Sequence, residues 1–223
     1  MGMDTATLIG IGAILGTLAI SVSLHEFMHG YMAYKLGDNT AKYSGRLTLN
    51  PLAHVDPFGT VLLPLILFII GGPLFGAAKP VPFNPSNLRN GETGFAMVAL
   101  VGPLTNLGLA IIGGIFYQLV PLGEVATYVL AVFILLNIGL FVFNMIPVPP
   151  LDGSRVLYVL APEGVRRFMQ TLESGGLFTI AILVFVLFPL GLGVALGQAI
   201  SILSNWVAGT DLQLLLSQLQ QAL

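Results

Sequence analysis

Two histidines and a glutamate lie close together in the pentapeptide H-E-F-M-H, which spans His25 to His29. On a helix, side chains four residues apart project from the same face, about 5–6 Å apart, so both imidazoles can reach one metal ion. Glu26 follows the first histidine and can act as the general base for a water molecule on that ion. The spacing H-E-x-x-H is therefore typical of a helix that binds zinc and supports hydrolysis.

The residues before this motif favour a metal site over a histidine pair that only fills a core. From Ala6 to Leu24 there is no charged residue, and the stretch is strongly apolar. Placing two imidazoles and a carboxylate at the end of such a segment in hydrocarbon costs free energy, unless these groups are paired with other polar groups or serve a function. A purely structural pair is the alternative, and it is harder to sustain in this setting.

The overall composition indicates a membrane protein. The 223 residues are 56% hydrophobic and 8% charged, with a mean hydropathy of +0.93, whereas a soluble domain carries about 25% charged residues. The net charge of −2 provides no basic surface for phosphates, so we expect no nucleic-acid partner. Because the chain has no cysteine, a metal must be bound by His, Asp, Glu or water.

The apolar segments predict an all-α polytopic membrane protein with about five to six transmembrane or re-entrant segments. We expect a first helix from about Ala6 to Lys35, ended by Gly37, and further spans at Phe95–Val120 and Tyr128–Met145. A more polar helical stretch should follow at Ser154–Ser174. The chain is expected to be one membrane-embedded domain (1–223), with a core at about 6–156 and C-terminal helices at 157–223.

Three other segments leave alternatives open. Val61–Gly72 is apolar but only a dozen residues long, which suits a re-entrant segment better than a full span. Leu177–Val207 contains Pro189 and can form one kinked helix or two short ones. The tail from Asp211 alternates Leu and Gln and is consistent with a short interfacial helix.

The polar stretch Asp38–Thr60 contains the alternating residues 47–49 before Pro51. This pattern predicts an extended strand or small β-hairpin at the membrane edge. A strand edge there can pair with the unwound backbone of a substrate, through residues such as Arg46 and Leu47. An ordinary hairpin without that role fits the sequence equally well.

Charge placement predicts an orientation. All basic residues lie in three connecting segments: Lys35, Lys42, Arg46, Lys79, Arg89, Arg155, Arg166 and Arg167. The positive-inside rule makes these segments cytoplasmic, which requires Val61–Gly72 to enter and leave on one side. We therefore expect a multi-pass protein of the cell (plasma) membrane, with His25, His29 and Asp152 at one depth towards the cytoplasm.

Asp152 is the best candidate for a third metal ligand, since a catalytic zinc takes three protein ligands and one open position. It follows the proline-rich sequence 147–150, where a regular helix cannot continue, and Gly153 allows a tight turn beside it. We favour a ligand over a helix cap because of the expected membrane depth. His54, in a polar loop, is a weaker candidate that either contacts a ligand or is purely structural.

Taken together, H-E-F-M-H and N-M-I-P-V-P-P-L-D-G resemble the motifs of the site-2 protease family of intramembrane metalloproteases. Three blocks between them resemble its compact bacterial and archaeal members: G-R-L-T-L-N-P-L-A-H-V-D-P-F-G-T, A-K-P-V-P-F-N-P and G-P-L-T-N. The similarity extends from about Leu24 to Val156. Unlike larger relatives, the chain offers no room for a PDZ or nucleotide-sensing module.

The resemblance implies roles for individual residues. Glu26 would be the catalytic base, and three residues would bind one Zn²⁺ per chain: His25, His29 and Asp152. Asn144 matches the asparagine of the N-x-x-P-x-x-x-L-D-G block, which holds substrate in the family. Asn106 matches the last position of G-P-x-x-N, where it either contacts substrate or joins helices by packing.

The implied activity is that of an intramembrane zinc endopeptidase, which hydrolyses peptide bonds within or near transmembrane segments of membrane proteins, as in regulated intramembrane proteolysis. The expected partners are a transmembrane protein or peptide substrate and the bilayer, and both monomer and homodimer fit the sequence. A metal-binding transporter and a non-catalytic scaffold for membrane helices are the alternatives. Polar groups gathered at one membrane edge argue against the transporter, and the intact Glu26 argues against the scaffold.

Overall fold

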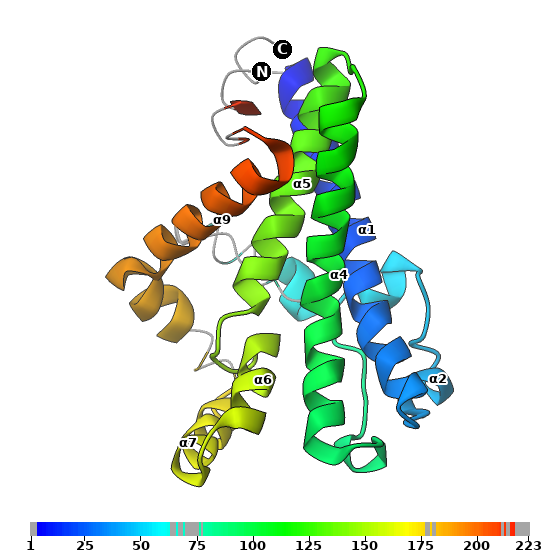
Figure 1. Cartoon of the computed structure of the whole chain (residues 1–223), viewed down its shortest axis with the longest axis vertical. Helices are drawn as coiled ribbons and strands as arrows, with labels where there is room; N and C mark the ends of the chain where they lie inside the picture. The colour runs from blue at the N-terminus through cyan, green and yellow to red at the C-terminus, as the bar shows by residue number, and fades with distance from the viewer. Residues whose placement is uncertain are drawn as a thin grey trace.

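Three long helices stand side by side and form the body of the molecule (Figure 1). In this computed structural model they are α1 (Thr5–Lys35), α4 (Gly91–Leu119) and α5 (Glu124–Asn144), and α1 packs against both of the others. The structure describes residues 4–62, 66, 69, 76, 78–176, 179, 182–210, 212, 215 and 216, with only the backbone at 61 and 184.

Four helices within the described residues are long and apolar enough to cross a membrane: α1, α4, α5 and the helical stretch Phe185–Ala208. Large apolar side chains along them face outward, where lipid tails would surround them. On α1 these are Leu8, Ile11, Ile14, Leu15 and Ile20. The all-α membrane fold is confirmed in this form, with four candidate spans in the described part of the chain against the five to six segments expected.

Local sequence explains where the long helices begin and end. Oδ1 of Asp4 accepts a hydrogen bond from the N–H of Thr7 at 2.8 Å and caps α1. Gly37, with φ of +107°, ends that helix as predicted. The other two spans each begin one turn earlier than expected, because Glu92 and Glu124 fit the first turn of a helix, where its dipole favours negative charge.

The largest buried apolar cluster lies where α9 (Gly193–Ala208) crosses α4 and α5 (Figure 1). Its buried members are Ala110, Ala131, Ile134, Ile138, Ala208 and Leu212. Small residues bring these helices close together. A Cβ at Gly113 would lie 2.9 Å from Cγ1 of Ile134, and one at Gly114 would collide with the backbone of Val207.

Among the described residues between α1 and α4 there are four short helical turns. They are α2 (Thr40–Tyr43), η1 (Pro51–His54), η2 (Pro57–Leu62) and η3 (Pro85–Asn87). Residues 46–50 have no regular secondary structure, and the described part of the chain contains no strand, so the predicted β-hairpin is not confirmed. The predicted re-entrant segment Val61–Gly72 lies almost entirely outside the described residues.

The chain after α5 folds into short helices before the last span. The predicted polar helical stretch is split at Pro162 into α6 (Asp152–Leu160) and α7 (Glu163–Ser174). The next predicted segment contains η4 (Leu183–Leu192) and α9. Gly191, near the end of η4, has a non-helical backbone (φ +114°), so the helix is kinked there. Of the two alternatives, the described residues therefore form a helix broken by a kink. The predicted tail helix from Asp211 lies almost entirely outside them.

Candidate active site

Three potential ligand atoms converge between α1 and the start of α6. Nε2 of His25 and Nε2 of His29 are 2.9 Å apart, and Oδ2 of Asp152 lies 3.2 and 3.3 Å from them. Two nitrogen ligands of a tetrahedral zinc, at 2.0–2.1 Å from the ion, are about 3.3 Å apart. The structure therefore brings the three predicted residues together at separations that fit one zinc ion.

The ring nitrogens on the far side of both histidines are already bound. Nδ1–H of His25 donates to Oδ1 of Asn106, and Nδ1–H of His29 donates to the carbonyl of Val98, each at 2.6 Å. A neutral imidazole with a proton on Nδ1 carries its lone pair on Nε2. Two such lone pairs at 2.9 Å repel each other unless a cation lies between them, so the donor set has the chemistry of a metal site.

The absence of a side chain at Gly102 on α4 keeps the space in front of the histidines open. A Cβ at this position would collide with Nε2 of His29 and lie 2.8 Å from Nε2 of His25. The next residue, Pro103, has no N–H, so one hydrogen bond of the helix backbone is missing at this point. The block G-P-L-T-N therefore forms the wall opposite α1 and, through Asn106, binds His25.

Asp152 reaches the histidines because α6 begins directly at this residue. Gly153 lets the start of α6 lie against the backbone at the end of α5, since a Cβ there would collide with the carbonyl of Met145. Oδ2 of the Asp152 carboxylate lies within 3.3 Å of Nε2 of both histidines. A carboxylate binds metals in its ionised form, so Asp152 adds a negatively charged oxygen ligand to the two imidazoles.

Glu26 does not contact this cluster through a hydrogen bond; its Oε2 accepts one from the backbone N–H of Val81 at 2.8 Å. Val81 belongs to the irregular segment 78–84, which lies along α1. Gly30 allows this approach, because a Cβ there would lie 2.9 Å from Cγ1 of Val81 and 3.4 Å from Cδ1 of Leu47.

Two other predicted site residues hold the same segment. The guanidinium of Arg46 donates to the carbonyl of Lys79 at 2.7 Å, and the carbonyl of His54 accepts from the N–H of Lys79 at 2.9 Å. Nε2–H of His54 donates to the carbonyl of Thr48 at 3.0 Å, so this histidine is buried away from the ligand cluster.

The two predicted asparagines differ in their surroundings. Asn144 is partly buried at the end of α5, and its amide donates to the carbonyl of Leu140 at 3.0 Å. Asn106 is fully buried behind His25, and its Nδ2 donates to Oδ1 of Asn137 at 3.1 Å. In this structure Asn106 therefore contacts a histidine and another asparagine rather than a surface that a substrate could reach.

Four residues at the site were not singled out from the sequence. Val98 and Val81 act through backbone groups, for which the sequence carries no local signal. Gly102 lies in the G-P-L-T-N block, whose glycine and proline within an apolar span could have drawn attention. Asn137 is a lone polar side chain within the apolar run of α5, and such residues mark functional or helix-joining positions.

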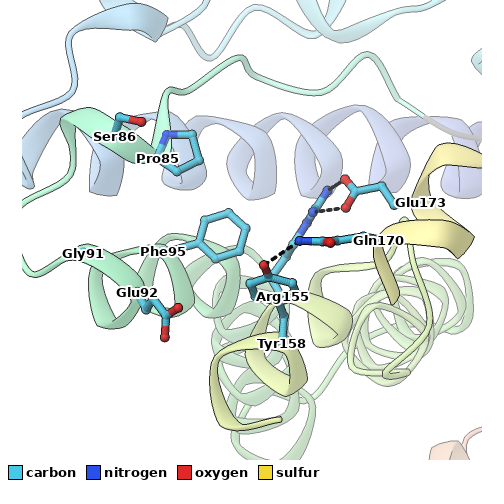
Figure 2. A pocket seen from close by; sticks show the side chains of 9 residues that line it. All are labelled: Pro85, Ser86, Gly91, Glu92, Phe95, Arg155, Tyr158, Gln170 and Glu173. Carbon is cyan, nitrogen blue, oxygen red and sulfur yellow. Dashed lines mark hydrogen bonds and ion pairs between the residues drawn. The ribbon is translucent and has the colours of Figure 1, made fainter. Parts of the chain in front are cut away.

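A pocket of about 430 Å³ lies farther along α6, between the start of α4 and α7 (Figure 2). Arg155, one turn after Asp152, donates to both carboxylate oxygens of Glu173 and lies 5.6 Å from the ring centroid of Phe95. On its other side, Arg166 of α7 donates to Glu92 of α4 at 2.5 and 3.0 Å. These ion pairs brace α6 and α7 against α4 and so hold the helix that carries Asp152.

The chain is similar to proteins that are named zinc metalloproteases. The model of peptidase family M50 matches residues 119–188, which include Asp152. The Bacillus subtilis (strain 168) protein named "Putative zinc metalloprotease YwhC" is 43% identical over 186 residues, or 78% of this chain and 80% of that protein. No solved structure is significantly similar to the chain.

Two more distant relatives carry the same zinc metalloprotease description. Rip2 of Mycolicibacterium smegmatis is 31% identical over 74% of this chain and 64% of its own length. MJ0611 of Methanocaldococcus jannaschii is 32% identical over 60% of this chain and 62% of its own length. The chain belongs to peptidase family M50, the site-2 protease family, and is a membrane zinc metalloprotease with Zn²⁺ as its cofactor.

Proposed function

We propose that this protein is an intramembrane endopeptidase that hydrolyses peptide bonds within or near transmembrane segments of other membrane proteins. The observation that carries the proposal is the position of the His-His-Asp cluster, whose two histidines lie on the candidate membrane span α1. About 30 Å of α1 separate Thr5 from His25 at 1.5 Å per residue, which is close to the thickness of the hydrocarbon core. The cluster then lies at the inner edge of that core, where a substrate helix ends.

We assign the roles within the site from its contacts. His25, His29 and Asp152 hold the ion, and their arrangement supports this assignment. When bound, Zn²⁺ supplies Lewis-acid chemistry: it acidifies a water molecule and polarises the scissile carbonyl. Glu26 would serve as the general base for the hydrolytic water and would pass that proton to the leaving amine. The N–H of Val81 binds Oε2 of this carboxylate and so restrains its orientation.

The substrate must expose its backbone before hydrolysis, because the hydrogen bonds of a helix shield the peptide carbonyl. We propose that residues 47–49 pair with the unwound substrate. The neighbouring segment Lys79–Asn84 is less suited to this pairing, because the N–H groups of Lys79, Val81 and Asn84 are bound within the chain and its two prolines have none. That segment therefore has few donors for a substrate strand.

We also propose that the protein lies in the plasma membrane with the active site towards the cytoplasm. The basic residues of α2, α6 and α7 lie at the same end of the bundle, and α1 ends and α4 begins there as well (Figure 1). This distribution supports the orientation. Since the chain has no cysteine, an Arg89→Cys variant in intact cells should resist a membrane-impermeant thiol reagent, and labelling from outside would refute the orientation.

The experiment that tests the activity is reconstitution of the purified, zinc-loaded protein into liposomes with a single-span substrate, followed by mass spectrometry of the products. We expect cleavage within or next to the span, and Glu26→Gln should abolish it while zinc stays bound. Turnover by Glu26→Gln would remove the assigned base. Zinc binding without cleavage of any span by the intact protein would favour a transporter or a binding scaffold instead.

A further inference from the structure

Two asparagines in the middle of the bundle form a hydrogen-bonded chain that ends on His25. Nδ2–H of Asn137 donates to the carbonyl of Phe133 at 2.9 Å, and Oδ1 of Asn137 accepts from Nδ2 of Asn106 at 3.1 Å. Oδ1 of Asn106 then accepts from Nδ1 of His25 at 2.6 Å. Both asparagine side chains are fully buried, on α4 and α5.

Each bond in this chain fixes the direction of the next. A carbonyl can only accept, so the bond to Phe133 turns the NH₂ of Asn137 away and leaves its oxygen facing Asn106. Asn106 then presents its NH₂ to Asn137 at 3.1 Å and, over the longer distance of 3.4 Å, to the carbonyl of Ser21, and its oxygen faces His25. Because an amide oxygen can only accept, His25 carries its proton on Nδ1 and keeps the lone pair of Nε2 for the ligand cluster.

Helix association alone does not account for this arrangement. An asparagine pair can join two membrane helices, and such a pair is satisfied without a third partner. Here the pair has one more acceptor, Oδ1 of Asn106, and this atom binds His25 of the metal cluster. His29 needs no such chain, because the backbone carbonyl of Val98 binds its Nδ1 directly.

We propose that Asn137 is a positioning residue of the metal centre, which acts through Asn106 to hold His25 in the tautomer and ring orientation that bind Zn²⁺. The proposal rests on the assigned role of His25 as a ligand and extends it to a residue that contacts neither metal nor substrate. Groups that bind the second nitrogen of a metal-bound histidine typically contribute 10- to 100-fold in metal affinity.

The test compares zinc affinity, by competition with a chelator, in the proteolytically silent Glu26→Gln protein and its derivatives. We expect Asn137→Leu to weaken zinc binding about 10- to 100-fold. Asn137→Asp, which keeps an acceptor for Asn106, should bind zinc nearly as well as the parent. Ser204→Ala, which removes a buried hydroxyl that donates to the carbonyl of Ser201 on the same helix α9, should have no effect.

A rescue variant separates positioning from general destabilisation. In Asn137→Leu/Asn106→Asp, the aspartate gives Nδ1–H of His25 a carboxylate acceptor that does not depend on residue 137, so zinc affinity should return. A purely structural role for Asn137 predicts no rescue. Parental zinc affinity in Asn137→Leu, or failure of the rescue in a protein that folds, would overturn the proposal.

A second readout needs no metal. Nitrogen-15 NMR of histidine-labelled, zinc-free protein reports which ring nitrogen carries the proton, and the chain has three histidines to assign. His25 should be protonated on Nδ1 in the parent and lose this preference in Asn137→Leu. An unchanged tautomer would refute the proposal, whereas absence of zinc binding in the parent would refute the proposed function itself.

Discussion

The carboxylate of Glu26 accepts a hydrogen bond from the backbone N–H of Val81 at 2.8 Å. These residues are 55 positions apart in the sequence, so the contact ties the assigned base on α1 to the segment that precedes η3. The same segment is fixed through Lys79 by Arg46 and through Asn84 by Asp38. Contacts that hold this segment in place therefore also restrain the carboxylate of Glu26.

Removing the N–H of Val81 should misplace the base without emptying the metal site. Val81→Pro continues the run Pro80–Pro82 and keeps an extended backbone, but it has no donor for Glu26. Because small misplacements of a catalytic group can cost about 100-fold, we expect kcat to fall about 10- to 100-fold with unchanged zinc content. Val81→Ala keeps the N–H and serves as control. Full activity of Val81→Pro would show that this bond does not orient the base.

A side chain at Gly102 should prevent metal binding. The added methyl of Gly102→Ala would occupy the space in front of Nε2 of His29 and His25, so we expect zinc, measured by mass spectrometry of metals, to be lost. Gly108→Ala is the matched control on the same helix, because a Cβ there would have no neighbour within 4 Å. A stoichiometric zinc content in Gly102→Ala would mean that the ion lies elsewhere.

Loss of a strand donor at Leu47 should impair substrate binding. Leu47→Pro removes one N–H from the proposed pairing edge, whereas Leu47→Ala keeps it, so a higher KM in the proline variant alone would point to the backbone. Arg46 is a poorer test position, since its N–H already donates to the carbonyl of Ala41 at 2.9 Å. Equal kinetics of Leu47→Pro and the parent, with zinc retained in both, would rule out pairing at this edge.

Asp38 should make the stability of the protein depend on acid pH. Burial raises the pKa of this buried carboxylate, but hydrogen bonds from Thr40, Asn87 and Asn84 outweigh burial and hold the pKa below its ordinary value. A lowered native pKa contributes stability that is complete above about pH 4 and is lost as the pH falls through the native pKa. The sign is therefore destabilisation in acid.

The matched variant is Asp38→Asn. Its side-chain NH₂ replaces one carboxylate oxygen that accepts hydrogen bonds, so at least one of the donors on Thr40, Asn84 and Asn87 loses its acceptor. We expect it to lower the free energy of unfolding by about 1–3 kcal/mol at pH 7. Midpoints of thermal unfolding across the acid range should show the difference between the two proteins shrinking as the pH falls below 4. A difference in midpoint that stays constant with pH would show that the ionised carboxylate of Asp38 is not what stabilises the protein.

The sequence predicted the parts of this molecule that depend on local patterns. Hydropathy and the glycine at 37 located the long helices, because a membrane span must satisfy its backbone within one continuous helix. The spacing of His25 and His29 and the break before Asp152 indicated three residues that the structure brings together. Family membership and the zinc cofactor were confirmed by the comparisons.

Local sequence patterns do not predict contacts between segments that are distant in the sequence. Nothing local indicates that Asn106 binds a histidine 81 positions earlier, or that Val81 binds Glu26. The strand expected at 47–49 rested on alternation over three residues, and the bonds of Asp38 and Arg46 to the neighbouring segment govern the described backbone there instead. Such hydrogen bonds depend on tertiary packing, which cannot be predicted from a single sequence.

The most direct test of the account is the zinc content and affinity of the purified protein, compared with those of Asp152→Ala. We predict about one tightly bound Zn²⁺ per chain and loss or strong weakening of binding in Asp152→Ala, while Glu163→Gln on the exposed face of α7 stays like the parent. Absence of zinc from the metal-replete parent, or tight stoichiometric zinc in Asp152→Ala, would contradict the metal centre proposed for His25, His29 and Asp152.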